Sequence, residues 1–302
     1  MRLKYLFTVL SGILKNLYFL TFVNGFLLSS LIYFRMEASY EYQVFSSIKK
    51  NIDRKIDADD TQDSVVVKVM QTCNTLLSSR SKIFKDDDLE GIKVDYMHPA
   101  TIDLMTAHGA CGSYSMVLAR LFQTYNLPVR IGQMKAHGIF ASHNITEVKI
   151  HQTWVVLDPT FNIYFTTPEN RLAAFSDLHN SWSYYRKQLP ATYDLSYKYD
   201  DVRYTNWTKI PIILPALKKT LDVLLGKEKA DGICLRVLFL RVYDLYFYCA
   251  LLLLIPIFLY TILKIIKAKL FAGGNTPVTF SNFAKRIKER MENGTHSKRL
   301  NT

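Results

Sequence analysis

The stretch His143–Asp158, HNITEVKIHQTWVVLD, determines how the middle of this chain folds. Residues 143–150 alternate between polar and apolar side chains and residues 153–157 are rich in strand formers, so both segments predict strands. The two residues between them form the turn of a predicted hairpin, and in that register Ile145 faces Asp158. His143 and Asp158 then lie on one face, roughly 7–8 Å apart along a diagonal, which is within side-chain reach. The sequence therefore predicts a contact between an imidazole and a carboxylate.

A predicted helix upstream of the hairpin carries a cysteine at its first turn. Cys111 lies in the segment Gly109–Ser113, GACGS, and the residues after it show the three- and four-residue spacing of one helical face. Pro128 ends the helix, because proline disfavours a helical conformation in the residue before it. The spacing places Cys111 on the inward-facing stripe at the helix N-terminus, where the helix dipole lowers the pKa of a thiol. The residues that define the stripe are Tyr114, Val117, Leu118, Leu121, Phe122 and Tyr125.

Cys111, His143 and Asp158 are the candidate catalytic residues. A thiol with a pKa of about 8.5 is mostly protonated at neutral pH. A nearby imidazole holds the thiolate form, and a carboxylate fixes the imidazole in one tautomer. Each residue alone also has a structural interpretation: a buried cysteine, a satisfied histidine, or a strand-ending Asp-Pro turn. Their order and spacing together favour nucleophilic catalysis.

These motifs resemble those of the transglutaminase-like superfamily, whose core is papain-like. The resemblance covers roughly residues 60–165, about a third of the chain. It comprises a cysteine that opens a helix, the segment Leu127–Arg130, a His-x-x-x-Glu-Val strand from His143 and a strand that ends in Asp158-Pro159-Thr160. The resemblance implies an α+β fold in which the helix with the nucleophile packs on an antiparallel sheet. Asn144-Ile145 departs from the Ala-Trp of many members, and no residue matches the family's side-chain oxyanion donor.

The resemblance implies that Cys111 attacks a carboxamide or other acyl carbon to form a thioester, with His143 as proton carrier and Asp158 as its orienting group. Water as the second substrate gives an amidase or peptidase, whereas an amine gives acyl transfer. The similarity to bacterial members suggests a peptide or amide-bearing envelope substrate. The alternative is a catalytically silent papain-like module that acts as a membrane scaffold. We expect no cofactor and no metal, because the histidines His98, His108, His137 and His151 match no metal-ligand spacing.

The cysteine content gives no disulfide framework. Cys73 lies in a predicted helix over residues 63–79, and Cys234 and Cys249 lie in or near an apolar segment. A Cys73–Cys111 disulfide, which would silence the thiol, is a minor alternative in an oxidising compartment.

Two uncharged stretches predict membrane spans. Leu17–Phe34 has 18 residues and Leu245–Leu263 has 19, and about 18–20 apolar residues cross the hydrocarbon core. Pro256 in the second stretch is tolerated in a spanning helix. A cleaved signal peptide is the alternative for the first stretch, but its length and the lack of a small-x-small cleavage pattern favour an anchor.

The net charge of +12 lies mainly beside these stretches. Residues 1–16 carry +3, residues 35–244 carry +2 and residues 264–302 carry +7. The positive-inside rule then places both termini in the cytoplasm and the central domain outside a cell (inner) membrane. Membrane lipid is therefore an expected partner, and nucleic acid is not; the oligomeric state stays open.

The sequence predicts seven consecutive parts. They are a cytoplasmic N-terminus (1–16), a transmembrane helix (17–34), a stalk (35–60), a transglutaminase-like domain (61–210), a membrane-proximal helical region (211–244), a second transmembrane helix (245–263) and a basic cytoplasmic tail (264–302). Residues 182–207 are dense in aromatic side chains, and packing onto the core is preferred there over a cleft rim or a collar on lipid headgroups.

Overall fold

The computed structural model describes residues 16–84, 90–136 and 138–271. The chain divides into two compact units, residues 34–246 and residues 1–33 with 247–302, and each is considered by itself. Almost all of the expected N-terminal segment 1–16 and most of the basic tail 264–302 lie outside the described residues, as does His137.

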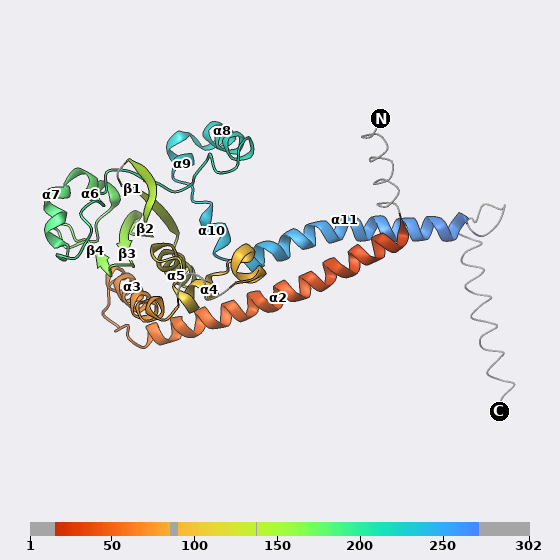
Figure 1. Cartoon of the computed structure of the whole chain (residues 1–302), viewed down its shortest axis with the longest axis horizontal. Coiled ribbons are helices and arrows are strands. Elements are labelled where there is room, and N and C mark those ends of the chain that lie inside the picture. The colour runs from red at the N-terminus through yellow and green to blue at the C-terminus, as the bar shows by residue number, and fades with distance from the viewer. Residues whose placement is uncertain (1–15, 85–89, 137, 272–302) are drawn as a thin grey trace, which may run out of the picture. The chain divides into compact units, whose positions relative to one another are not determined.

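Residues 34–246 contain an antiparallel sheet with helices, so the predicted α+β class is confirmed at that level. The strand order is β4-β3-β2-β1-β5, and Figure 1 shows α3, α4 and α5 gathered beside the strands. The strands are β1 (Val129–Ala136), β2 (Ile139–Ile150), β3 (Thr153–Asp158), β4 (Ile163–Tyr164) and β5 (Val202–Arg203).

The hairpin of β2 and β3 has the predicted register. Val148 pairs with Val155 and Ile150 pairs with Thr153. His151 and Gln152 form the two-residue turn between the strands, with φ of 46° and 66°. Two consecutive positive φ values are typical of such a turn, because they match the twist of the flanking strands. This register fixes which side chains of the two strands share a face.

One face of the sheet packs against helices. The helix α5 (Cys111–Thr124) lies against β1 and β2, and α3 (Gln62–Ser78) and α4 (Ala100–Thr106) pack against α5. Val117, Leu118 and Leu121 of α5 are fully buried in the same core as Ile131 and Leu157 of the sheet. The predicted helix therefore begins at Cys111 and buries the predicted stripe. Thr61 caps α3, because its side chain accepts a hydrogen bond from the Ser64 N–H.

The other face of the sheet is covered by the aromatic segment. Tyr185, Tyr193 and Tyr199 are buried around Met134 and Val156. These tyrosines therefore pack onto the core, which is the interpretation that the sequence favoured. The shorter helices of this part are α6 (Phe175–Asn180), α7 (Trp182–Tyr185), α8 (Ile213–Leu225), α9 (Lys227–Asp231) and α10 (Arg236–Phe239), with single turns at Arg80–Lys82, Lys93–Met97 and Arg186–Gln188.

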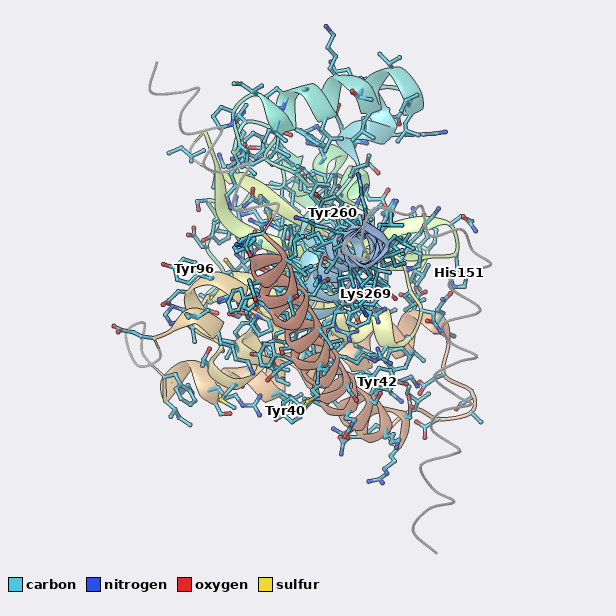
Figure 2. All side chains as sticks on the ribbon, turned by 90° about the vertical axis from the view of Figure 1, so that its right-hand side faces the viewer. Tyr40, Tyr42, Tyr96, His151, Tyr260 and Lys269 are labelled. Atoms are coloured by element: carbon cyan, nitrogen blue, oxygen red, sulfur yellow. The ribbon has the colours of Figure 1, made fainter. Side chains whose placement is uncertain are left out.

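Two helices are long and apolar enough to cross a membrane. They are α2 (Leu17–Asp53) and α11 (Val242–Phe271), which contains Pro256. In the unit that they share, Asn24 Nδ2 donates a hydrogen bond to Thr261 Oγ1 at 2.9 Å, a contact that aligns apolar helices in lipid. The helix α2 continues to Asp53 through residues expected to form a stalk, and Figure 2 labels two exposed tyrosines of that part, Tyr40 and Tyr42.

A buried ion pair joins α2 to α5 within residues 34–246. Arg120 Nε donates to Glu41 Oε1 at 3.0 Å, and the two side chains are only 6% and 3% exposed. Since a buried charge without its partner is costly, this pair fixes the register of α2 against the domain.

Glu41→Leu should lower the free energy of unfolding by about 3–5 kcal/mol, because it leaves the Arg120 guanidinium buried without a counter-charge. Chemical denaturation of the protein in detergent measures the loss. Glu37→Ala is the matched control on the same helix: its partner Lys93 is 41% exposed, so at most about 1 kcal/mol is expected. Equal losses in the two variants would contradict this assignment.

Candidate active site

The structure brings His143 and Asp158 into direct contact. His143 Nε2 lies 2.7 Å from Asp158 Oδ2, and both side chains are almost fully buried. The other carboxylate oxygen accepts hydrogen bonds from the Thr160 and Phe161 N–H groups at 3.2 and 3.4 Å. The turn after β3 therefore holds the carboxylate, and the carboxylate orients the imidazole.

Cys111 lies half-buried at the first turn of α5 and contacts two consecutive residues of β2. Asn144 Nδ2 donates a hydrogen bond to Cys111 Sγ at 3.4 Å, and the His143 ring is close enough to lower the pKa of the thiol. Because Asp158 engages Nε2 of His143, Nδ1 is the nitrogen left for the sulfur. The structure thus brings the three predicted residues together in the series Asp158, His143 and Cys111.

The electrostatics of the site favour a thiolate and an imidazolium. Burial raises the pKa of the Cys111 thiol, but hydrogen bonds from His143 and Asn144 outweigh burial and hold the pKa below its usual value. Burial lowers the pKa of His143, whereas its bonds to Asp158 and Cys111 raise the pKa to about 9. Both shifts have the direction that a thiolate–imidazolium pair requires.

Aromatic rings enclose the imidazole. Tyr197 stacks on His143 with ring centroids 4.5 Å apart and an interplanar angle of 13°, and Phe161 lies 5.6 Å away at an angle. The Tyr193 hydroxyl donates to Asp158 Oδ2 at 3.2 Å. These contacts exclude water from the His143–Asp158 bond and fix the ring plane.

A hydrogen-bonded clamp holds the loop before the nucleophile. Ser113 Oγ donates to Asp103 Oδ1 at 2.5 Å and accepts from the Gly109 N–H at 2.8 Å. His98 Nε2 contacts the same carboxylate oxygen at 3.1 Å, and this contact raises the pKa of His98 to about 9. Ala110, the residue before Cys111, has φ of 43°, a conformation that costs an L-residue about 1–3 kcal/mol. The clamp stabilises a strained backbone that presents the thiol.

The sequence did not assign several residues of this site. Arg236 Nη1 donates to Asn144 Oδ1 at 2.8 Å and so aims the amide N–H₂ at the sulfur. The sequence signal for Asn144 is its position directly after His143 on the same strand. Arg236 lies 92 residues away along the chain, and no spacing rule connects it to the hairpin.

The other cysteines and histidines discussed in the sequence analysis are not part of the series Asp158, His143 and Cys111. Cys73 and Cys111 are both free thiols, so the alternative disulfide is not formed. His151, which is labelled in Figure 2, lies in the exposed hairpin turn. Its Nε2 atom is 3.6 Å from Asp63 Oδ1. No group of three or more His, Cys, Asp or Glu side chains suited to a metal ion occurs among the described residues.

Comparison with known proteins identifies no relative: no family model, no curated protein and no solved structure matches this chain. The assignment of the site therefore depends on its own geometry.

The alkylation rate of Cys111 by iodoacetamide should retain a thiolate plateau at pH values below the ordinary thiol pKa of about 8.5. The lowered pKa has this sign because thiolate persists, as the pH falls, until the pH passes that pKa. His143→Ala should raise the inflection toward the ordinary value, and Asn144→Leu should raise it by a smaller amount. Mass spectrometry of the Cys111 peptide measures the rates, with Lys187→Gln as an exposed control. A wild-type inflection at or above about 8.5 would refute the thiolate assignment.

Proposed function

We propose that this protein is a membrane-anchored, transglutaminase-like cysteine enzyme that acts on amide or acyl groups through a thioester at Cys111. The observation that carries the proposal is the series from Asp158 through His143 to Cys111, with a 2.7 Å imidazole–carboxylate contact and a lowered thiol pKa. A helix that bears the nucleophile and packs on an antiparallel sheet supports a papain-like core.

The first half of the reaction forms the thioester. The Cys111 thiolate attacks the carbonyl carbon, and the carbonyl electron pair moves onto oxygen. Because α5 begins at Cys111, the N–H groups of its first turn have no partner within the helix. The Gly112 N–H donates to the Gly109 carbonyl at 2.8 Å, so the Cys111 N–H and Asn144 Nδ2 are the groups that can donate to this oxyanion. Collapse breaks the carbon–nitrogen bond, and the leaving amine takes the proton from the His143 imidazolium.

The second half regenerates the thiolate. His143, now neutral, accepts a proton from water or from an acceptor amine as that nucleophile attacks the thioester carbon. The carbon–sulfur bond breaks, and the product is a carboxylic acid or a new amide. Asp158 keeps the imidazole in one tautomer and stabilises its charged form throughout.

The cellular setting is part of the proposal. Two helices able to cross a membrane and basic segments at both ends of the chain support an inner-membrane protein with cytoplasmic termini and an extracytoplasmic catalytic domain. A peptide or amide-bearing component of the cell envelope fits that location.

Variants of the three residues test the chemistry. Cys111→Ala should abolish covalent labelling by an acyl-thiol probe, and Asp158→Asn should slow labelling by orders of magnitude through the wrong imidazole tautomer, about 10⁴-fold in the best-studied triad. Trapping the acyl-enzyme and weighing the adduct identifies the acyl donor. With that donor, turnover should fall as the pH rises through about 9, because the imidazolium that protonates the leaving amine is lost.

A Cys111→Ala variant with full activity would refute the proposal. A Cys111 that alkylates normally but forms no adduct with any envelope fraction would instead favour the silent binding module.

Protease added outside spheroplasts should cleave within residues 35–244 and leave tags on both termini intact. Immunoblots against each tag measure this, with detergent-lysed cells as the control for tag sensitivity. A protected central domain with a cleaved C-terminal tag would mean that the orientation is inverted.

A further inference from the structure

A cavity of about 490 Å³ lies next to Arg236 of the candidate site, within residues 34–246. It is enclosed by β1, β5, the segment after β5, the start of α8 and α10. The side chains that define its chemistry are basic (Arg203, Lys209 and Arg236) and apolar (Ile210, Leu214 and Phe239).

No carboxylate balances the three basic side chains of the cavity. No carboxylate lines the cavity, and among the described residues none of the three side chains forms an ion pair. Arg203 Nε donates to the neutral amide of Gln133 at 3.0 Å, and Arg236 donates to that of Asn144. Burial lowers the pKa of Arg236, and the neighbouring charge of Arg203 lowers it further. Cations that repel one another in a partly buried cavity form a site for an anion.

The cavity and the nucleophile share one residue. Asn144 accepts from Arg236 with its carbonyl oxygen and donates to Cys111 Sγ with its amide nitrogen. Gln133, which also lines the cavity, is the cross-strand neighbour of Asn144. A molecule bound between Arg203 and Arg236 is therefore connected to the thiol through two side chains, Arg236 and Asn144.

The apolar part of the cavity continues onto the surface. Ile210 and Leu214 line the cavity, and between them Ile212 and Ile213 are 85% and 65% exposed. An exposed aliphatic strip beside a cationic cavity fits a ligand with an aliphatic chain and an anionic group.

We propose that this cavity binds the substrate of Cys111, and that the substrate is an amide-bearing anionic amphiphile. Its carboxylate or phosphate contacts Arg203, Lys209 and Arg236, its aliphatic chain lies against the apolar wall, and its amide carbon reaches Cys111. The inference rests on the proposed function and names the substrate class of the same site.

Protection of Cys111 from alkylation tests this inference. The full chain in phosphatidylcholine nanodiscs is treated with neutral iodoacetamide in the presence of hexyl phosphate, inorganic phosphate or hexanol. Hexyl phosphate should slow alkylation at concentrations at which the other two compounds have no effect. Arg203→Gln and Lys209→Gln should each raise the half-protecting concentration about tenfold, the factor for losing one charge-assisted hydrogen bond. Lys187→Gln, an exposed lysine outside the cavity, should leave it unchanged.

Three results would overturn the inference: no protection by hexyl phosphate, equal protection in wild type and both cavity variants, or equal protection by inorganic phosphate. Calorimetric titration with hexyl phosphate separates this inference from the proposed function. Loss of thiol reactivity with retained binding refutes the enzyme alone, and a reactive but unprotected Cys111 refutes the cavity alone.

Phosphatidylglycerol nanodiscs without hexyl phosphate then distinguish the two sources of the anionic amphiphile. Slower alkylation of Cys111 in these discs identifies a bilayer lipid, and unchanged alkylation identifies a soluble amphiphile.

Discussion

The buried hydrogen bond between His143 and Asp158 is the constraint on which the rest of the site depends. Both side chains are removed from solvent, so each polar atom needs a protein partner. Asp158 obtains its partners from the turn after β3 and from Tyr193. A one-residue slip of the hairpin would move Asp158 to the other face of the sheet and leave the imidazole unpaired. The register of β2 and β3 and the packing of the aromatic segment are therefore coupled to the chemistry.

One strand supplies both side chains that act on the sulfur. His143 and Asn144 are consecutive in β2, and Asn144 Nδ2 donates to Cys111 Sγ while the His143 ring lowers the pKa of the thiol. His143 connects the thiol to the buried carboxylate, and Asn144 connects it to Arg236. Cys111 thus lies between the His143–Asp158 pair and Asn144, whose side chain accepts a hydrogen bond from Arg236 of the cavity.

Sequence patterns predicted the elements whose conformation depends on residues close together in the chain. Alternation and a two-residue turn gave the hairpin register that places His143 beside Asp158, and three- and four-residue spacing gave the helix that starts at Cys111. Tyr193 and Arg236 were not predicted as site residues, because 35 and 92 residues separate them from their partners and only tertiary packing selects such pairs. The catalytic roles, the membrane orientation and the papain-like core remain predictions from the sequence.

The charge of the site changes during the proposed reaction, and that change argues for an anionic acyl group. The resting thiolate is attracted to Arg236 across Asn144. Once the thioester forms, the sulfur is neutral and this attraction is lost, so it no longer offsets the repulsion between Arg203 and Arg236. A carboxylate or phosphate on the acyl part would restore that balance for the lifetime of the thioester. The same group on the leaving amine would depart with it, so the cavity stabilises the intermediate only when the anion belongs to the acyl donor.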